Sequence, residues 1–407
     1  MRRWRRCRSQ VCDAVAETIR TGAWLASAAG GVRGIFPPVS AHVYLVPGFF
    51  GFANLGKLTY FGHVRDTLAA TLGPGTTVHA VRTPPTASLP RRAAHLARTI
   101  AQTARDGGPV HLIGHSSGGL DARLLLCPGV ALPGRVDVET VARRVQTVVT
   151  VSTPHHGTPV ASFFASVQGE RLLQLLSLST IYMLRFGSLP LAALLRLGAM
   201  FARADRHLGL NSALLDQLFD QLLANFGAGR RRAVRELLQE VHADPALVQQ
   251  LTLEGMAVFD ALARLRPGVR AGSVVTLGYA PGVRSTLAAG LDPSAHATHA
   301  LYGVLHQLAG RAAEDPPALD RAQAAVLRRA YGSVPPPAAN DGVVPTRSQV
   351  WGTVIHAATA DHLDVIGHFP DPTHVPPHFD WLASGSGFDR ERFDAVWRDV
   401  ARFVTGT

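Results

Sequence analysis

The sequence predicts an α/β fold with a mostly parallel central sheet, helices around it and a helical insertion. Three observations lead to this prediction. Short apolar runs alternate with stretches of helical periodicity in the first part of the chain, as βαβ units require. After residue 158 the sequence becomes Leu-rich and helical. Strand-like runs return after about residue 270, so the insertion divides the core into two parts.

Each predicted strand is a short apolar run that ends in a turn signal, and each predicted helix has apolar residues at helical spacing. In the first part, the predicted strands cover residues 42–46, 77–81, 110–113 and 145–151, and the predicted helices cover 89–105 and 117–126. In the insertion, helices are predicted within 172–183 and 189–201. In the last part, strands are predicted over 273–277 and 349–356, and a closing helix over 389–404.

We therefore expect four parts: a basic N-terminal helical extension over 1–40, the first core part over 41–159, a helical cap or lid over 160–270, and the second core part over 271–407. The extension begins with an arginine cluster, and Val11, Val15 and Ile19 recur at four-residue steps. This spacing predicts an amphipathic helix on the domain or on a membrane surface. Charged residues interrupt the stretch that an export signal needs, which favours a cytoplasmic or peripheral membrane location over secretion.

The formal net charge of +11 on 407 residues first suggests an anionic partner. Lys57 is the only lysine, and the arginines are spread along the chain without a basic stripe interleaved with aromatic residues. We therefore expect no nucleic-acid binding and only a weak attraction to anionic membranes. The three cysteines, Cys7, Cys12 and Cys127, have no regular spacing and predict neither a disulfide framework nor a metal site. Nothing in the sequence sets the oligomeric state.

The sequence GHSSG at residues 114–118 fits the pattern G-x-S-x-G. A nucleophilic serine at the tip of a tight strand-to-helix turn needs neighbours without side chains, and the following helix directs its amides at a developing oxyanion. The bare pattern is common by chance, but here it directly follows a predicted strand and precedes a predicted helix. It predicts Ser116 as a nucleophile and an α/β-hydrolase fold.

A serine nucleophile needs a histidine base that is held by an acid, and in this fold the chain order is serine, acid, histidine. Asp341 lies in a turn before a predicted strand, and His362 follows one strand and one loop later. The competing bases His155 and His156 precede the acid. The competing acids, Asp361 and Asp364, are too near in sequence to reach the histidine ring. We therefore predict Asp341 and His362 as acid and base.

The oxyanion hole needs two amides, which we expect from Ser117 and from Phe49 in the loop after the first strand. Phe50 is expected to line an acyl slot, and Phe163 and Phe164 lie at the root of the cap as further substrate contacts. The cap admits two interpretations: a mobile lid of an enzyme that acts at lipid interfaces, or a fixed cap that shapes a closed pocket.

Four motifs resemble those of bacterial triacylglycerol lipases and related esterases: VPGF at 46–49, GHSSGG at 114–119, STPHHGT at 152–158, and NDG at 340–342 with HLD at 362–364. The resemblance covers about 42–160 and 340–370, and it implies a serine carboxylic ester hydrolase that forms an acyl-enzyme from esters with apolar acyl chains and requires no cofactor. It also implies that the third motif is a turn under the pocket floor. The chain departs from the family at Pro47, where these lipases usually carry histidine.

The resemblance further implies a structural calcium with Asp364 and Asp292 as candidate ligands. The alternative is that Asp364 only braces the histidine loop, since His368 occupies the place of an amide ligand. The predicted triad also suits an acyltransferase, a phospholipase or a polyester depolymerase. A non-catalytic α/β-hydrolase scaffold is the remaining alternative, and loss of a triad residue, its expected signature, is not seen.

Overall fold

The computed structural model describes residues 40–49, 60–165, 212–228, 246–288, 293–311, 316–371 and 382–406, with isolated residues and short pieces between them. The chain divides into two compact units, Met1–Pro38 and Val39–Thr407. All described residues belong to the second unit. The predicted N-terminal helical extension therefore lies outside the described residues, apart from Ser40.

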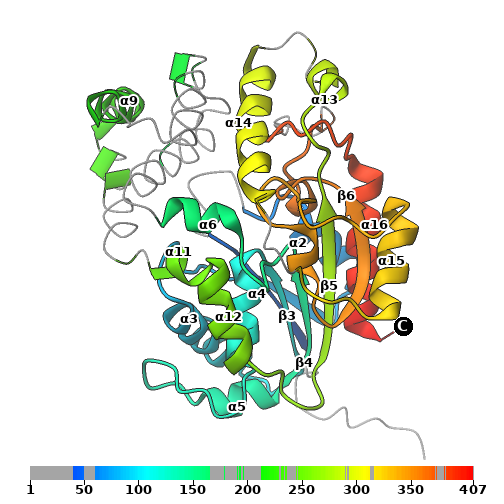
Figure 1. The fold of residues 1–407 in the computed structure, drawn as a ribbon. Coiled ribbons are helices and arrows are strands. Elements are labelled where there is room, and N and C mark those ends of the chain that lie inside the picture. The colour runs from blue at the N-terminus through cyan, green and yellow to red at the C-terminus, as the bar shows by residue number, and fades with distance from the viewer. Residues whose placement is uncertain are drawn as a thin grey trace, which may run out of the picture. The chain divides into compact units, whose positions relative to one another are not determined.

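One six-stranded sheet organises the second unit, and all five strand pairs are parallel. The order of the strands across the sheet is β2-β1-β3-β4-β5-β6. Their bounds are Ala41–Val46 (β1), Thr76–Ala80 (β2), Val110–His115 (β3), Val145–Val151 (β4), Arg270–Leu277 (β5) and Thr353–Thr359 (β6). This parallel sheet, with a sharp strand-to-helix turn after β3, confirms the predicted α/β-hydrolase fold (Figure 1).

The central strands are apolar throughout because both faces of the sheet are covered. Every residue of β3 is buried. In β1, Val43 and Leu45 face one core, and the alternating residues Tyr44 and Val46 face the other. Near-continuous apolar runs of this kind are typical of strands in parallel sheets.

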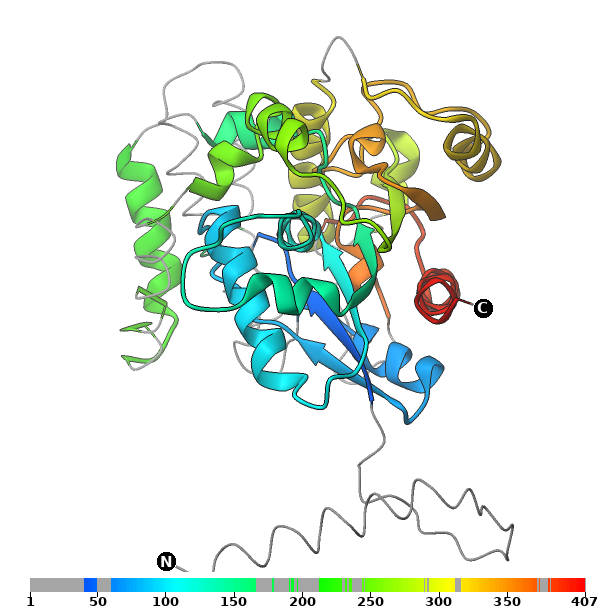
Figure 2. The same ribbon diagram turned by 90° about the horizontal axis from the view of Figure 1, so that it is seen from below.

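Helices cover both faces, as Figures 1 and 2 show. Helices α2 and α16 pack against the face of Val43, where Trp397 is the largest buried side chain. Helices α3, α4 and α5 pack against the face of Tyr44. Their bounds are Val64–Leu72 (α2), Leu89–Thr103 (α3), Ser117–Leu125 (α4), Val138–Arg143 (α5) and Arg390–Thr405 (α16).

The segment between β4 and β5 is helical wherever the structure describes its regular elements. These helices are Pro159–Phe164 (α6), Ser212–Ala224 (α9), Ala246–Gln250 (α11) and Leu253–Leu262 (α12). The helices predicted within 172–183 and 189–201 fall on residues of which only isolated positions are described. Among the described residues, no helix is both long enough and apolar enough to span a membrane.

The last part of the chain returns to the sheet, and its described residues between β5 and β6 include three α-helices: Val283–Ala288 (α13), Pro293–Ala309 (α14) and Arg321–Tyr331 (α15). The strand predicted over 349–356 is wrong at its start. Residues Thr346–Gln349 form a short 3-10 turn, and β6 begins only at Thr353. The reason is that the Gln349 side chain is fully buried and donates a hydrogen bond to Asp341. The backbone therefore turns here before it joins the sheet.

Candidate active site

Ser116 lies at the tip of the turn between β3 and α4. Its backbone is strained for a residue with a side chain, with φ 54° and ψ −133°. The glycines of the motif have a steric cause. A Cβ on Gly114 would lie 2.5 Å from the carbonyl oxygen of Gly118, and a Cβ on Gly118 would collide with the carbonyl of Val46. The G-x-S-x-G pattern is thus what this turn requires in order to pack against β1.

Asp341 and His362 are brought together by the loops that follow β5 and β6. Asp341 Oδ2 lies 2.9 Å from His362 Nδ1. The His362 backbone amide also donates to the Asp341 carbonyl at 3.0 Å. Asp341 is fully buried and His362 is nearly so. The carboxylate can therefore fix the ring orientation and the tautomer of this histidine.

The carboxylate of Asp341 is held by four further donors. Oδ1 accepts from the amides of Val343 (3.0 Å) and Val344 (2.8 Å). Oδ2 accepts from Thr276 Oγ1 (2.8 Å) and Gln349 Nε2 (3.1 Å). Such hydrogen bonds favour the charged form of a buried carboxyl. Sequence reasoning missed Thr276 and Gln349, because Thr276 lies in an ordinary apolar stretch and Gln349 follows three polar residues, and neither belongs to a motif.

The STPHHGT motif contacts Thr276, one of the residues that hold Asp341, through Ser152. Ser152 has a positive φ of 49°, and its hydroxyl lies 2.9 Å from Thr276 Oγ1. His155 is buried and bonds Thr150 Oγ1 at 3.1 Å, whereas His156 lies 4.0 Å from Asp260. These contacts place both histidines in other polar environments, away from Asp341.

His362 lies beside the Ser116 turn through its contact with His115. The two imidazole ring centroids are 4.7 Å apart, and His115 Nε2 lies 2.9 Å from the His362 carbonyl oxygen. Burial, assisted by the nearby His362, lowers the pKa of His115 well below its usual value. The residue directly before the candidate nucleophile therefore contacts the backbone of the candidate base.

The loop after β1 approaches the candidate nucleophile closely. A Cβ on Gly48 would lie only 2.6 Å from Ser116 Cβ, so this position has room for no side chain. Pro47 has no amide hydrogen, and the Gly48 amide donates to Tyr60 Oη at 2.9 Å. Phe49 follows them and is half-buried, and Ser117 begins α4. The structure thus brings the loop that carries the predicted amide donor Phe49 next to Ser116.

A buried ion pair holds the carbonyl groups of this loop. Arg92 Nε donates to both carboxylate oxygens of Asp121 at 3.0 Å, and neither side chain is exposed. Arg92 Nη2 also donates to the carbonyls of Pro47 (2.8 Å) and Gly48 (3.3 Å). Burial raises the pKa of Asp121 to about 6, although the positive charge of Arg92 opposes this rise. This pair was not predicted from the sequence, since its partners lie on two different helices, α3 and α4.

The residues that were predicted to contact the substrate differ in their burial, and one of them lies outside the described residues. Phe164 is buried in an apolar cluster with α9 and α14, and Phe163 is half-buried against it. Phe49 and Leu363, which follows His362, pack against the same cluster. Phe50 lies outside the described residues. An apolar region thus adjoins the candidate base.

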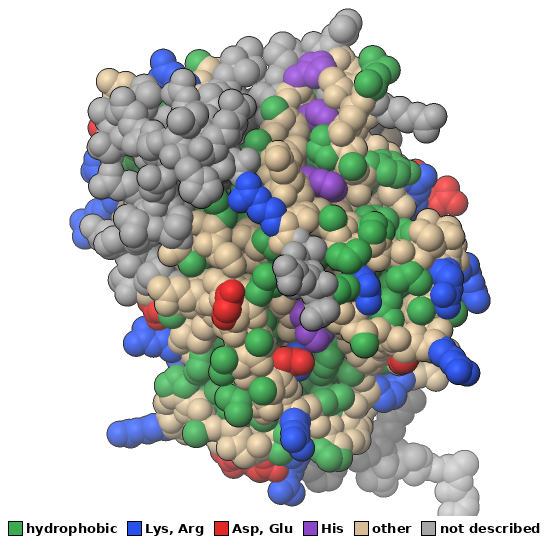
Figure 3. Space-filling model, in the orientation of Figure 1, with side chains coloured by type: hydrophobic (Ala, Val, Ile, Leu, Met, Phe, Trp, Pro, Cys, Tyr) green, Lys and Arg blue, Asp and Glu red, His purple; other side chains and the backbone are tan. Residues whose placement is uncertain are grey.

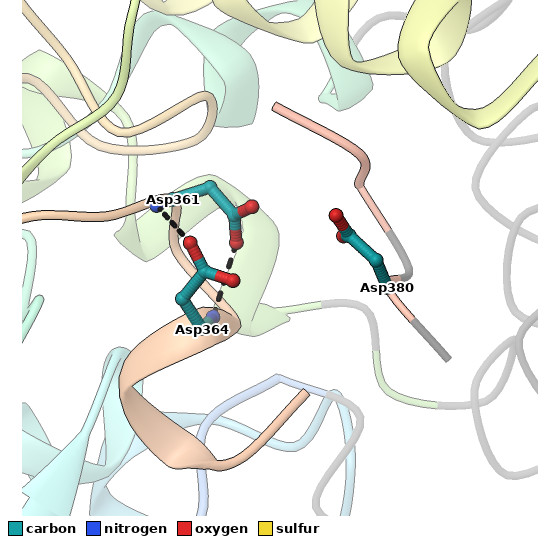
Figure 4. Close-up of side chains that lie close together, drawn as sticks. All are labelled: Asp361, Asp364 and Asp380. Carbon is teal, nitrogen blue, oxygen red and sulfur yellow. Dashed lines mark hydrogen bonds between the residues drawn. The ribbon is translucent and has the colours of Figure 1, made fainter. Parts of the chain in front are cut away.

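Asp364 belongs to a group of three carboxylates, with Asp361 and Asp380, whose ligand atoms lie within 4.8 Å of one another (Figure 4). Asp361 and Asp364 also accept each other's backbone amides, at 3.1 and 2.9 Å. Burial, together with the neighbouring carboxylates, raises the pKa of Asp364 well above its usual value and that of Asp380 to about 7. An all-carboxylate donor set suits a hard cation such as calcium.

Two details refine the predicted calcium ligands. Asp380 was not singled out from the sequence, since it is distant from Asp364 along the chain. The other predicted ligand, Asp292, lies outside the described residues. His368 lies elsewhere, with Nε2 2.9 Å from the Tyr60 carbonyl oxygen. Among the described residues, no other group of three metal-ligating side chains is found.

On the face shown in Figure 3, Lys and Arg side chains are scattered and interspersed with acidic and apolar side chains. They form no continuous basic stripe on this face.

No protein-family model matches this chain, and no curated protein matches it in sequence. Several solved structures that are similar to it are lipases and esterases. A metagenomic carboxyl esterase is 18% identical, with 94% of this chain and 82% of that chain covered and a TM-score of 0.49. Lipase 1 of Pelosinus fermentans is 16% identical over 89% and 99% of the two chains, with a TM-score of 0.49. The Staphylococcus hyicus lipase is 14% identical over 93% and 98%, with a TM-score of 0.46.

Proposed function

We propose that this protein is a serine carboxylic ester hydrolase of the lipase and esterase type, with the triad Ser116, His362 and Asp341. The observation that carries the proposal is the 2.9 Å contact between the buried Asp341 carboxylate and His362 Nδ1, beside the strained turn of Ser116. A carboxylate on Nδ1 leaves Nε2 of the imidazole to accept a proton. Three of the four motifs of the lipase resemblance, VPGF, GHSSGG and STPHHGT, lie at the carboxyl ends of β1, β3 and β4. The fourth contributes Asp341 and His362.

The chemistry is acyl transfer in two steps. His362 takes the proton of Ser116 as the hydroxyl attacks the ester carbonyl, and Asp341 stabilises the imidazolium that forms. The amides of Phe49 and Ser117 stabilise the tetrahedral oxyanion. His362 then gives the proton to the leaving alcohol, and water releases the acid from the acyl-enzyme by the same route. A bound calcium would be held by Asp361, Asp364 and Asp380 and would brace the His362 loop without a part in these steps.

The proposed substrate has an apolar acyl chain, because an apolar cluster around Phe164 adjoins the loop of His362. Exposed apolar side chains also favour contact with a lipid surface. Val283 and Leu287, one turn apart on α13, are 78% and 74% exposed, and Tyr279 before them is 54% exposed. Hydrolysis rates for esters from acetyl to palmitoyl, measured below and above their solubility limits, distinguish a soluble-ester enzyme from one that acts at interfaces.

The test is hydrolysis of p-nitrophenyl butyrate by the wild type and by Ser116→Ala. We expect the wild type to hydrolyse this ester and Ser116→Ala to lose the activity while its circular dichroism spectrum stays the same. Ser88→Ala is the matched control, since Ser88 precedes α3 and makes no side-chain cap bond. Retention of full activity in Ser116→Ala would contradict the proposed mechanism.

A further inference from the structure

Tyr60 and His115 form a continuous hydrogen-bond chain between the loop after β1 and the backbone of His362. The Gly48 amide donates to Tyr60 Oη at 2.9 Å. Tyr60 Oη lies 2.6 Å from His115 Nδ1, and His115 Nε2 lies 2.9 Å from the His362 carbonyl oxygen. The chain thus connects the loop that packs against Ser116 with the backbone of His362, through the residue that directly precedes Ser116.

The chemistry of the two ends fixes the direction of every bond. A backbone amide can only donate, so Tyr60 Oη accepts from Gly48, and it donates its own proton to His115 Nδ1 when that nitrogen is unprotonated. A carbonyl can only accept, so His115 carries its proton on Nε2. This arrangement needs a neutral imidazole, and burial lowers the pKa of His115 well below its usual value. Each donor then meets an acceptor, and only one tautomer of His115 fits.

We propose that Tyr60 and His115 are positioning residues. They hold the loop after β1, which carries the predicted amide donor Phe49, and the base His362 in fixed positions relative to Ser116. The inference rests on the proposed function for its kinetic consequence. Gly48 packs directly against Ser116, where a Cβ would lie 2.6 Å from Ser116 Cβ. A shift of this loop therefore moves the predicted amide donor Phe49 relative to the nucleophile. A shift of the His362 backbone moves the base.

The hydroxyl of Tyr60 is the link on which both ends depend. Without it, the Gly48 amide loses its acceptor and His115 Nδ1 loses its donor. His115 keeps its proton on Nε2 for the His362 carbonyl, but its ring is then held at one nitrogen only. Tyr60→Phe removes the hydroxyl and keeps the ring, which packs edge-on against Phe61 with centroids 5.0 Å apart.

The kinetic test compares Tyr60→Phe with Tyr44→Phe. Tyr44 is a matched control because it is fully buried and its hydroxyl bonds one side chain, Thr103 Oγ1, at 2.6 Å. We expect kcat of Tyr60→Phe to fall about ten- to hundred-fold, towards the loss seen on removing an oxyanion donor, with KM changed less than about two-fold. The circular dichroism spectra of both variants should match that of the wild type. An unchanged kcat, or equal losses of kcat in both variants, would overturn the inference.

A second measurement does not depend on activity. Nitrogen-15 NMR of the histidine rings at pH 7 should find His115 neutral and protonated on Nε2, with the signal assigned from its loss in His115→Gln. In Tyr60→Phe the tautomer should be kept, but the Nδ1 resonance should shift because this nitrogen loses its donated hydrogen bond, and the Gly48 amide should exchange its hydrogen faster. If the wild type hydrolyses no ester, the proposed function is wrong, but this measurement still tests the hydrogen-bond chain. A charged His115, or an Nδ1 resonance that is the same in the wild type and in Tyr60→Phe, overturns the hydrogen-bond chain itself.

Discussion

Asp341 Oδ2 receives hydrogen bonds from three side chains, and His362 Nδ1, at 2.9 Å, is the one that leads to the candidate nucleophile. In the proposed mechanism His362 is the partner that reacts, and the other donors hold the carboxylate. In the proposed mechanism its charge and its orientation are both required. These two requirements can be separated by substitution.

Asp341→Asn keeps the size of the side chain and removes its charge. The amide can present its nitrogen to His362 and so select the wrong tautomer. We expect kcat for p-nitrophenyl butyrate to fall about 10⁴-fold with little change in KM, as for a serine protease triad acid. Circular dichroism checks that the fold is kept. An Asp341→Asn variant within ten-fold of the wild type would remove Asp341 from the triad.

Thr276→Val tests the support of this carboxylate, since the two side chains have the same shape. The variant removes one donor to Asp341 Oδ2. A hydrogen bond to a charged group is worth about 1.5–3 kcal/mol. If the loss of this hydrogen bond raises the activation free energy by that amount, kcat falls about ten- to hundred-fold. Thr147→Val is the control, because Thr147 is equally buried and bonds His111 on the neighbouring strand. Similar rates for both variants would argue against a role of Thr276.

Arg92→Met leaves the charge of Asp121 buried without its partner. We expect the free energy of unfolding in urea to fall by about 3–5 kcal/mol. The double variant Arg92→Met with Asp121→Leu should recover much of this stability, since it buries no lone charge. It should not recover kcat, because the carbonyls of Pro47 and Gly48 still lack their donor. Recovery of both stability and kcat would show that Arg92 does not position the loop.

His111 provides a pH test of stability. Burial, assisted by the charge of Arg270, lowers the pKa of His111 to about 4. Between pH 6.5 and 4 the unfolded chain therefore binds more protons at this residue, and its contribution to stability is lost as the pH falls. The free energy of unfolding of the wild type should decline relative to that of His111→Gln in this window, by at most about 1.4 kcal/mol per pH unit. Parallel curves for the two proteins would contradict this.

The regular core of the fold was predictable from the sequence because its signals are local. The run of residues 145–151 is bounded by charged and turn-forming residues, and the strand Val145–Val151 has the predicted bounds. Pro47 and Gly48 mark the end of β1 in the same way. The G-x-S-x-G turn was also local, since its glycines are required by contacts within a few residues and with the adjacent strand.

The supports of the site were not predictable, because they depend on contacts between distant segments. Arg92 resembles any helical arginine until the fold places Asp121 and the Pro47 carbonyl around it. Gln349 fits a strand in the sequence, but its side chain is drawn to Asp341 and the backbone turns. Tyr60 carries no motif at all. Asp380 joins Asp364 only through the folding of the C-terminal loop.

The most direct test of the central claim is labelling with a fluorophosphonate probe, which reacts with activated serines, followed by mass spectrometry of the peptides. We predict stoichiometric labelling of the peptide that contains Ser116, confined to that serine, and its loss in His362→Ala, which lacks the base. Absence of labelling in the folded wild type, or labelling at another serine, would contradict the assignment of Ser116 as the nucleophile.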